Sequence, residues 1–270
     1  MSNPANVPGA STDRAGSAYW NAQETNKVLR PAFDPGPKTV RNFGRRTLDA
    51  FLRRHLEALP NSSRLIELGC GGSTMLPYFH KKFGFEVAGL DYSEQGCALA
   101  TQICLQNGCK AQIVCADLFS APPEMRQAFD VVVSFGLAEH FADTAGCIRA
   151  FSSYLRNGGM IITTVPNMAG LVGKLQKFAD RHVFDTHVVL DAEDLCAAHA
   201  DPGLTVLECG YLSFLNFGVV NPGRASIAKR LVLTLSRGIT GVCWAVESMV
   251  GSLRANKITS PYAYCVARKS

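Results

Sequence analysis

Residues 65–73 read LIELGCGGS, and residues 85–91 read FEVAGLD. The first stretch is an apolar run that passes through Glu67 into a glycine-rich turn. The second is an apolar run that ends on Asp91, 22 residues after Gly69. Glycine lets a turn approach a ligand closely because it has no Cβ. A carboxylate at the tip of the following strand is placed to accept hydrogen bonds from both hydroxyls of a ribose. The pattern therefore predicts a site for a molecule that contains adenosine.

The residues of the turn discriminate between the adenosine cofactors. A dinucleotide fingerprint has a third glycine where this chain has Thr74, and the carboxylate of Glu67 would repel a pyrophosphate. The same carboxylate would favour an ammonium group, or would hold an amide of the turn in place. S-adenosylmethionine carries an ammonium and a sulfonium and has no phosphate. The turn therefore favours this cofactor over a nicotinamide dinucleotide, and a nucleotide-linked oxidoreductase is the disfavoured alternative.

With these residues, the chain resembles the class I S-adenosylmethionine-dependent methyltransferases. The likeness covers about residues 60–215, and one departure is Ser73, which stands where the family has its third turn glycine. The resemblance implies S-adenosyl-L-methionine as the cofactor, with a non-catalytic regulatory protein that binds it as the alternative. The cofactor-binding residues that it implies are Trp20, Glu67, Gly69, Gly71, Asp91, Tyr92, Asp117, Leu118, Ser134 and Phe135.

The family assigns roles to several of these positions. An acidic residue at Asp117 would accept from the adenine amino group, and Leu118 would pack on the ring; a turn aspartate is the alternative. The loop that begins at Ser134 would run beneath the methionine half of the cofactor. Tyr19 and Trp20 lie in a segment that folds over the cofactor in such enzymes, where aromatic rings suit a cationic sulfonium. Ordinary packing of a short N-terminal helix is the alternative for this pair.

The loop after the fourth predicted strand indicates the substrate class. Residues 134–141 read SFGLAEHF and lack the Asn/Asp-Pro-Pro-aromatic sequence of methyltransferases that act on nucleobase amino groups. The loop instead resembles that of small-molecule methyltransferases. His140 could accept a proton from a hydroxyl, since an unperturbed imidazole has a pKa of about 6.5; a histidine that shapes the loop is the alternative. We therefore predict an oxygen nucleophile on an acidic metabolite or natural-product intermediate, with lipid, quinone, nitrogen and sulfur acceptors as alternatives.

Basic residues follow the fifth predicted strand. Lys174, Lys177 and Arg181 are spaced by three and four residues, which places them on one face of a predicted helix. They would form either a clamp for an anionic group of the acceptor or a solvated face. The predicted substrate-binding residues are Tyr19, Lys174, Lys177 and His187.

Apolar runs alternate with helical patterns along most of the chain. Helices are expected near Ser17 and at 40–59, 74–83, 93–106 and 143–155. Strands are expected at 65–68, 85–90, 111–115, 129–134, 160–165, 204–214 and 262–268. This alternation predicts an α/β fold with a doubly wound, mostly parallel seven-stranded sheet. Together with the family resemblance, this alternation implies the Rossmann-like methyltransferase fold, with N-terminal helices and a C-terminal helical insertion.

We expect one methyltransferase domain over residues 16–270, after a disordered lead at 1–15. Its core covers 60–215 and a last strand at 260–268. Two insertions are expected to form a substrate lid: residues 166–190 and 218–259. A partner surface and an amphipathic contact with lipid, which its basic residues would favour, are alternatives for the second. A membrane span is not expected, because Arg237 and Glu247 interrupt the apolar run that it needs.

Composition excludes several classes of protein. The net charge of +5 comes without a dense Lys/Arg block, so nucleic acid is not indicated as a partner. The ten cysteines contain no C-x-x-C pair, so neither a metal site nor a disulfide framework is expected. The polar N-terminus shows no secretory signal, and a reducing cytoplasm is the expected location. The oligomeric state is left open.

Overall fold

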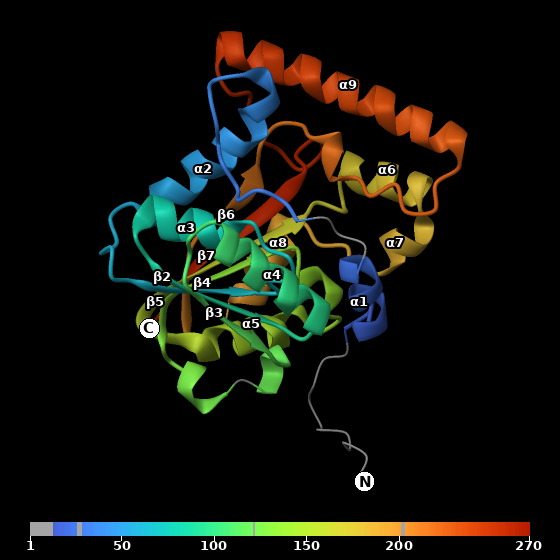
Figure 1. Ribbon diagram of the computed structural model, residues 1–270. Coiled ribbons are helices and arrows are strands. Elements are labelled where there is room, and N and C mark those ends of the chain that lie inside the picture. The colour runs from blue at the N-terminus through green and yellow to red at the C-terminus, as the bar shows by residue number, and fades with distance from the viewer. Residues whose placement is uncertain (1–12, 26–28, 121, 201–202) are drawn as a thin grey trace.

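The computed structural model describes residues 13–25, 29–120, 122–200 and 203–270. Its centre is a seven-stranded sheet in the order β3-β2-β1-β4-β5-β7-β6, with β7 antiparallel to both of its neighbours and the other pairs parallel (Figure 1). The strands are β1 (Arg64–Leu68), β2 (Glu86–Asp91), β3 (Ala111–Cys115), β4 (Phe129–Phe135), β5 (Leu155–Pro166), β6 (Leu204–Leu212) and β7 (Tyr262–Lys269). The expected doubly wound, mostly parallel sheet is confirmed.

Helices cover both faces of this sheet (Figure 1). They are α1 (Ser17–Thr25), α2 (Phe43–Leu56), α3 (Met75–Phe83), α4 (Glu94–Gln106), α5 (Thr144–Tyr154), α6 (Leu171–Ala179), α7 (Arg181–Asp185), α8 (Ala192–His199) and α9 (Ile227–Val250). Several begin at the side-chain caps that short polar residues provide. The Ser93 hydroxyl accepts from the Gly96 amide at the start of α4, and Asp191 forms a capping box at the start of α8.

Successive residues of the central strands enter two separate cores. Ile66 and Val132 pack with α5 and α8 on one face, whereas Leu65 and Val131 pack with α2, α3 and α4 on the other. This follows from the period of two along a strand, and it is why these runs are apolar throughout. The arrangement brings the carboxyl ends of β1, β2 and β4 to one edge of the sheet, where ligands of doubly wound folds bind.

Three local expectations differ from the structure. β5 starts at Leu155 rather than 160, because the chain passes through a left-handed Gly158 (φ 77°) and an irregular pairing with β4 without leaving the sheet. Asp180 ends α6 and caps α7, so Arg181 lies in a different helix from Lys174 and not on one continuous face. Within the lead expected to be disordered at 1–15, Asp13 and Arg14 hydrogen-bond to Tyr92 and His140 of the body of the protein; residues 1–12 lie outside the described residues.

The C-terminal insertion contains one long helix, α9, which lies along one end of the molecule apart from the sheet (Figure 1). It packs on α2, on α6 and on the short 3₁₀ turns at Val40–Asn42 and Phe217–Val219. Within the described ranges, none of the helices has the length and apolar character that crossing a membrane requires.

Candidate functional site

The turn after β1 is held by its own side chains. Gly69 and Gly72 have φ values of 75° and 60°, a left-handed backbone that favours glycine. The Ser73 hydroxyl donates to a Glu67 carboxylate oxygen over 2.5 Å and accepts from the Met75 amide over 3.0 Å. Burial raises the pKa of Glu67 to about 7, against the lowering effect of this hydrogen bond. The serine that replaces the family's third glycine therefore joins the end of β1 to the start of α3.

Asp91 joins the second strand to the same turn. Its two carboxylate oxygens accept from the Gly71 and Ser93 amides, each over 2.8 Å. A carboxylate at the end of the second strand is where ribose hydroxyls are bound in doubly wound folds. The side chain also lines a cavity of about 190 Å³ at the sheet edge. Asp91 therefore lies between the glycine turn and the cavity, and its role toward a ribose stays a prediction.

The cavity of about 190 Å³ gathers most of the predicted cofactor residues, and we call it the cofactor cleft. The predicted residues that line it are Trp20, Gly69, Gly71, Asp91, Tyr92, Leu118 and Phe135. Leu90, Ser93, Ala116, Gly136 and Leu137 also line it, and the sequence reasoning missed them. All five lie within two residues of a predicted residue at the end of a strand. The signal that could have found them is this proximity along the chain.

Three predicted cofactor residues do not line the cleft. Glu67 is buried behind the turn, as its contact with Ser73 requires. Ser134 is fully buried at the end of β4, and its hydroxyl has no hydrogen-bond partner in the described part of the chain. Asp117 is exposed and accepts from the Phe119 amide over 2.9 Å, which is the turn-aspartate alternative.

An N-terminal strap crosses the site, formed by residues 13–20. One carboxylate oxygen of Asp13 accepts from the Trp20 indole nitrogen over 2.9 Å and from the Tyr92 hydroxyl. The Arg14 amide donates to the His140 carbonyl over 2.9 Å, and its guanidinium donates to the His187 carbonyl over 2.8 Å. The strap therefore holds Trp20 over the cleft. Asp13 and Arg14 belong to the segment 1–15, for which the sequence predicts disorder, and no helical or strand pattern in the sequence indicates their contacts.

A second and larger cavity, of about 600 Å³, adjoins the cofactor cleft; we call it the acceptor cavity. The two share Trp20, Phe135 and Gly136 in their walls. The other walls of the acceptor cavity are mostly apolar and aromatic: Phe33, Leu48, Met75, Leu212, Val219, Trp244 and Tyr262. An apolar cavity with a few polar groups is the usual form of a small-molecule site.

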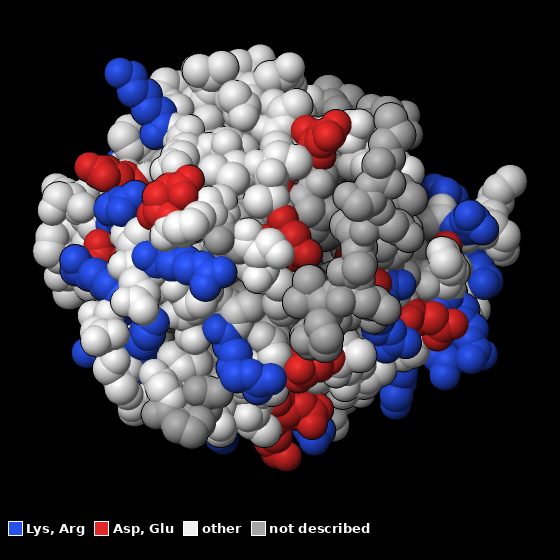
Figure 2. Space-filling view, turned by 90° about the horizontal axis from the view of Figure 1, so that it is seen from below, with Lys and Arg blue, Asp and Glu red and all other residues white. Residues whose placement is uncertain are grey.

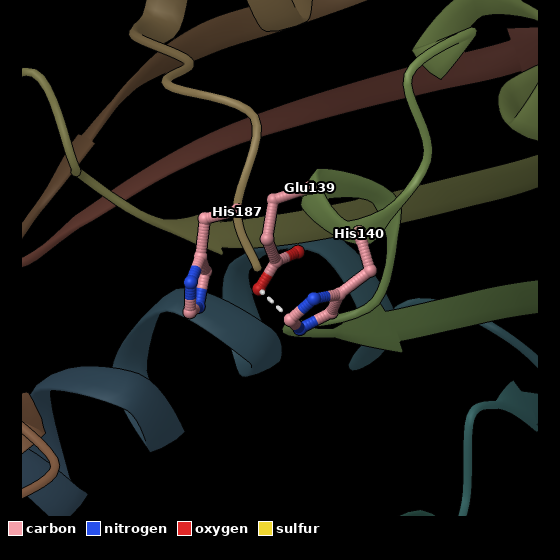
Figure 3. Close-up of side chains that lie close together, drawn as sticks. All are labelled: Glu139, His140 and His187. Carbon is pink, nitrogen blue, oxygen red and sulfur yellow. Dashed lines mark ion pairs between the residues drawn. The ribbon is translucent and has the colours of Figure 1, made fainter. Parts of the chain in front are cut away.

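His140 and His187 line the acceptor cavity with Glu139, and Figure 3 shows the three side chains together. The Nδ1 atom of His140 lies 2.9 Å from the Thr186 carbonyl oxygen, and Nδ1 of His187 lies 2.8 Å from the Val183 carbonyl oxygen. A carbonyl accepts only, so Nδ1 carries the proton of each neutral ring and Nε2 is the acceptor. Both rings therefore offer a lone pair at Nε2.

The buried carboxyl beside them is incompletely paired. A Glu139 oxygen, Oε1, lies 3.8 Å from Nε2 of His140, and Oε2 has no hydrogen-bond partner among the residues described. Burial raises the pKa of Glu139 to about 8. Burial, helped by the nearby His187, lowers the pKa of His140 to about 4. Both groups are therefore mainly neutral at pH 7.

The same three residues could hold a metal ion. Each offers one ligand atom, and these atoms lie within 4.8 Å of one another. Two imidazoles and a carboxylate suit Zn²⁺ or Fe²⁺, and backbone carbonyls on Nδ1 orient histidine ligands in metal sites. The absence of a metal remains a prediction.

The basic residues at the acceptor cavity differ from those predicted. Lys174 and Lys177 are exposed on α6 and do not line the cavity, whereas Arg41 and Arg45 do. Tyr19 is half-buried against Trp20 and His182 and stays outside the lining. Neither arginine was predicted, because no pattern in the sequence distinguishes Arg41 and Arg45 from the other basic residues of this helical region.

Comparison with known families agrees with this geometry. A family model described as a methyltransferase domain matches residues 40–209. The chain belongs to this methyltransferase family. The resemblance to class I S-adenosylmethionine-dependent methyltransferases is thereby confirmed.

This methyltransferase spans about half the length of the curated relatives that it matches. One is a ubiquinone biosynthesis O-methyltransferase from Idiomarina loihiensis, 26% identical over 117 residues, which are 43% of this chain and 47% of that protein. Among solved structures, the cyclase SpnF superposes with a TM-score of 0.62 at 14% identity, covering 97% of this chain and 98% of that one. Geranyl diphosphate C-methyltransferase from Streptomyces coelicolor A3(2) has a TM-score of 0.58 at 17% identity, covering 94% and 96%. At these identities the solved structures confirm the fold alone.

Proposed function

We propose that this methyltransferase moves a methyl group from S-adenosylmethionine to a hydroxyl oxygen of a small, largely apolar acceptor. The observation that carries the proposal is the junction of the two cavities at Trp20, Phe135 and Gly136, beside His140. A cofactor in the cleft would present its methyl group at that junction. An acceptor in the larger cavity would approach the methyl group from the other side.

The cofactor assignment is supported by the cleft and by relatives. Asp91 and the glycine turn suit the ribose, and the strap places the Trp20 ring over the cleft, where an aromatic face favours a sulfonium. The geranyl diphosphate C-methyltransferase was solved with S-adenosyl-L-homocysteine bound. Ubiquinone biosynthesis O-methyltransferases are named for transfer to oxygen. These likenesses favour an oxygen acceptor and keep a quinone-like ring among the candidates.

The chemistry places few demands on the side chains. An O–CH₃ bond forms as the S–CH₃ bond breaks, and the hydroxyl proton leaves for a base. The protein must align oxygen, carbon and sulfur and exclude water. We assign the proton to Nε2 of His140, which lies 3.8 Å from Oε1 of Glu139. Glu139 stabilises the imidazolium by charge only once it ionises, near pH 8. A base with a pKa of about 4 suffices, because an oxygen becomes strongly acidic once the methyl group is bound to it.

The walls of the acceptor cavity indicate the kind of acceptor. Phe33, Met75 and Trp244 favour an apolar or aromatic body. Arg41 and Arg45 favour an anionic substituent on it, in place of the predicted Lys174 and Lys177. The insertion at 218–259 contributes Val219 and Trp244 to the wall, which supports its assignment as a lid over the acceptor.

The test is methyl transfer from labelled S-adenosylmethionine to phenolic carboxylic acids and catechols. We expect a labelled O-methyl product, and we expect His140→Gln to lower kcat about 10²–10⁴-fold without changing the cofactor Kd. His80→Gln is the control, because His80 also contacts a backbone carbonyl, that of Phe85, but lines neither cavity. Calorimetry that shows NAD binding without S-adenosylmethionine binding would exclude the proposal. SpnF, described as a cyclase, shares this fold, so cofactor binding without any transferred label would indicate a non-methylating protein.

A further inference from the structure

α9 is attached to the protein by a narrow inner strip. Leu233, Thr240 and Glu247 are its buried residues. The Thr240 hydroxyl accepts from the Phe217 amide over 2.9 Å, and the Trp244 indole donates to the Leu215 carbonyl over 3.1 Å. Two defined hydrogen bonds and a buried strip fix the orientation of the helix. Its opposite face must therefore point outward.

That outward face is apolar along the whole helix. Its large side chains recur at intervals of three, four or seven residues, which is one or two helical turns, and their exposed fractions run from 53% for Ile239 to 89% for Ile227. The residues are Ile227, Leu231, Leu235, Ile239, Val242 and Met249. An apolar stripe of this length is unusual on a soluble monomer and marks a surface that binds something. We call these six residues the α9 stripe.

The charged residues of α9 that reach the surface are positive, and they lie toward its inner contacts: the Lys229 ammonium donates to the Ala179 carbonyl over 3.4 Å and the Arg237 guanidinium to the Val220 carbonyl over 3.4 Å. Lys229, Arg230 and Arg237 are the basic residues of the helix, and its single acid, Glu247, is buried. The guanidinium of Arg230 donates to the Gly223 carbonyl over 3.1 Å, which holds its charge beside the helix. Figure 2 shows the side of the molecule away from α9, where acidic and basic side chains are interspersed.

These charges decide between the two simplest occupants of the stripe. A second copy of α9 would bring arginines to arginines, with no exposed acid on the helix to neutralise them. An anionic lipid surface would satisfy both features, because it accepts the apolar stripe between its headgroups and attracts the basic residues of the helix. The inner face supports the same choice, since Trp244 of α9 lines the acceptor cavity.

We propose that α9 is an interfacial helix that docks this methyltransferase on an anionic bilayer, with the α9 stripe in the headgroup region and the acceptor cavity beside it. The acceptor would then be an amphiphile that reaches the cavity from the lipid. The docking stands independently of methyl transfer, whereas the nature of the acceptor rests on the proposed function.

The test is co-sedimentation of the full chain with vesicles of phosphatidylcholine alone or mixed with phosphatidylglycerol. We expect the protein to bind the mixed vesicles, and to bind the neutral vesicles at least about tenfold more weakly, since each cation near an anionic surface adds attraction. The variant Leu231→Ser/Leu235→Ser/Ile239→Ser should bind the mixed vesicles at least about tenfold less, because it buries less apolar area. Leu105→Ser is the control, as Leu105 is 70% exposed on α4. Circular dichroism checks that both variants fold.

Two results would overturn the proposal. One is wild-type protein that stays in the supernatant with both vesicles. The other is a wild-type dimer in light scattering that the triple variant dissociates, which would make a second copy the occupant. Vesicle binding is measured without turnover, so an absence of methyl transfer to soluble phenols would leave it unaffected and would count against the proposed function only.

Discussion

The cofactor cleft and the acceptor cavity are built in different ways. The cleft is formed by the ends of β1, β2 and β4 and the turns that follow them, with backbone amides fixed by Asp91 and Glu67 through Ser73. The acceptor cavity draws on residues from Trp20 to Tyr262, most of them outside the central strands. One site therefore follows from the core of the fold, whereas the other follows from the segments added to it. Cofactor binding in the cleft should therefore be sensitive to single changes, whereas acceptor binding in the cavity should tolerate them.

The largest expected effect is on the cleft, from Asp91→Ala. The variant removes the acceptor for two turn amides and for the ribose, and each hydrogen bond to a charged group contributes roughly 1.5–3 kcal/mol. S-adenosylmethionine binding should weaken by at least about 100-fold in calorimetry. Asp117→Ala is the matched control, because this exposed strand-end carboxylate bonds only within its own turn in the described structure. Equal losses in the two variants would place the adenine on Asp117 and break the comparison.

The next effect concerns pH and the junction of the two sites. Burial raises the pKa of Glu139 to about 8, so the carboxylate forms only as pH rises through that value. Ionised Glu139 should strengthen His140 as a base, so kcat should rise about tenfold between pH 7 and 9. Glu139→Gln should flatten this part of the profile. If kcat of Glu139→Gln still rose about tenfold between pH 7 and 9, a group other than Glu139 would be responsible for the pH dependence.

The same carboxyl gives a stability prediction with a definite sign. A folded pKa above the unfolded value means that the folded state holds more protons between about pH 4.5 and 8, so stability falls as pH rises through that window. Thermal melts should show Glu139→Gln gaining on the wild type as pH rises from 5 to 9. A constant difference between the two proteins would mean that Glu139 ionises normally.

A smaller effect is expected at the wall of the acceptor cavity. Arg41→Gln/Arg45→Gln should raise KM for a carboxylate-bearing acceptor about tenfold, and more at low salt. Lys174→Gln/Lys177→Gln should change KM less than about twofold, because exposed charges outside the cavity are screened. A larger increase in KM for the Lys174/Lys177 variant than for the Arg41/Arg45 variant would show that the acceptor's anionic group is bound by the lysines of α6, as the sequence predicted.

The smallest effect is expected from removal of metal. If Glu139, His140 and His187 contact the acceptor directly, dialysis against EDTA should leave kcat and the melting temperature unchanged. Loss of turnover that Mg²⁺, Zn²⁺ or Fe²⁺ restores would show instead that the three residues form a metal site. Such a result would make the acceptor cavity as dependent on single residues as the cleft.

The sequence alone predicted the sheet and most of the cleft. β1, β2 and β4 are continuous apolar runs because both faces are buried, and their ends are marked by glycine or acidic residues. Gly69 needs a left-handed φ, and Asp91 bonds the turn amides that follow β1; both are properties of short segments. Local patterns of this kind can be read from a single sequence, because the interactions that require them are close along the chain or set by strand period.

The acceptor side was decided by tertiary structure. Arg14 reaches the carbonyl of His187 across 173 positions, and His140 meets His187 only because α7 ends against the loop after β4. Arg41 and Arg45 carry no pattern that separates them from Lys174 and Lys177. Whether a charge lies at a cavity or in solvent depends on how an added segment packs, and that packing is a sum of many weak long-range contacts. The exposed stripe of α9 shows the same limit, since its apolar period predicts a buried face and only the folded chain shows that the face is left uncovered.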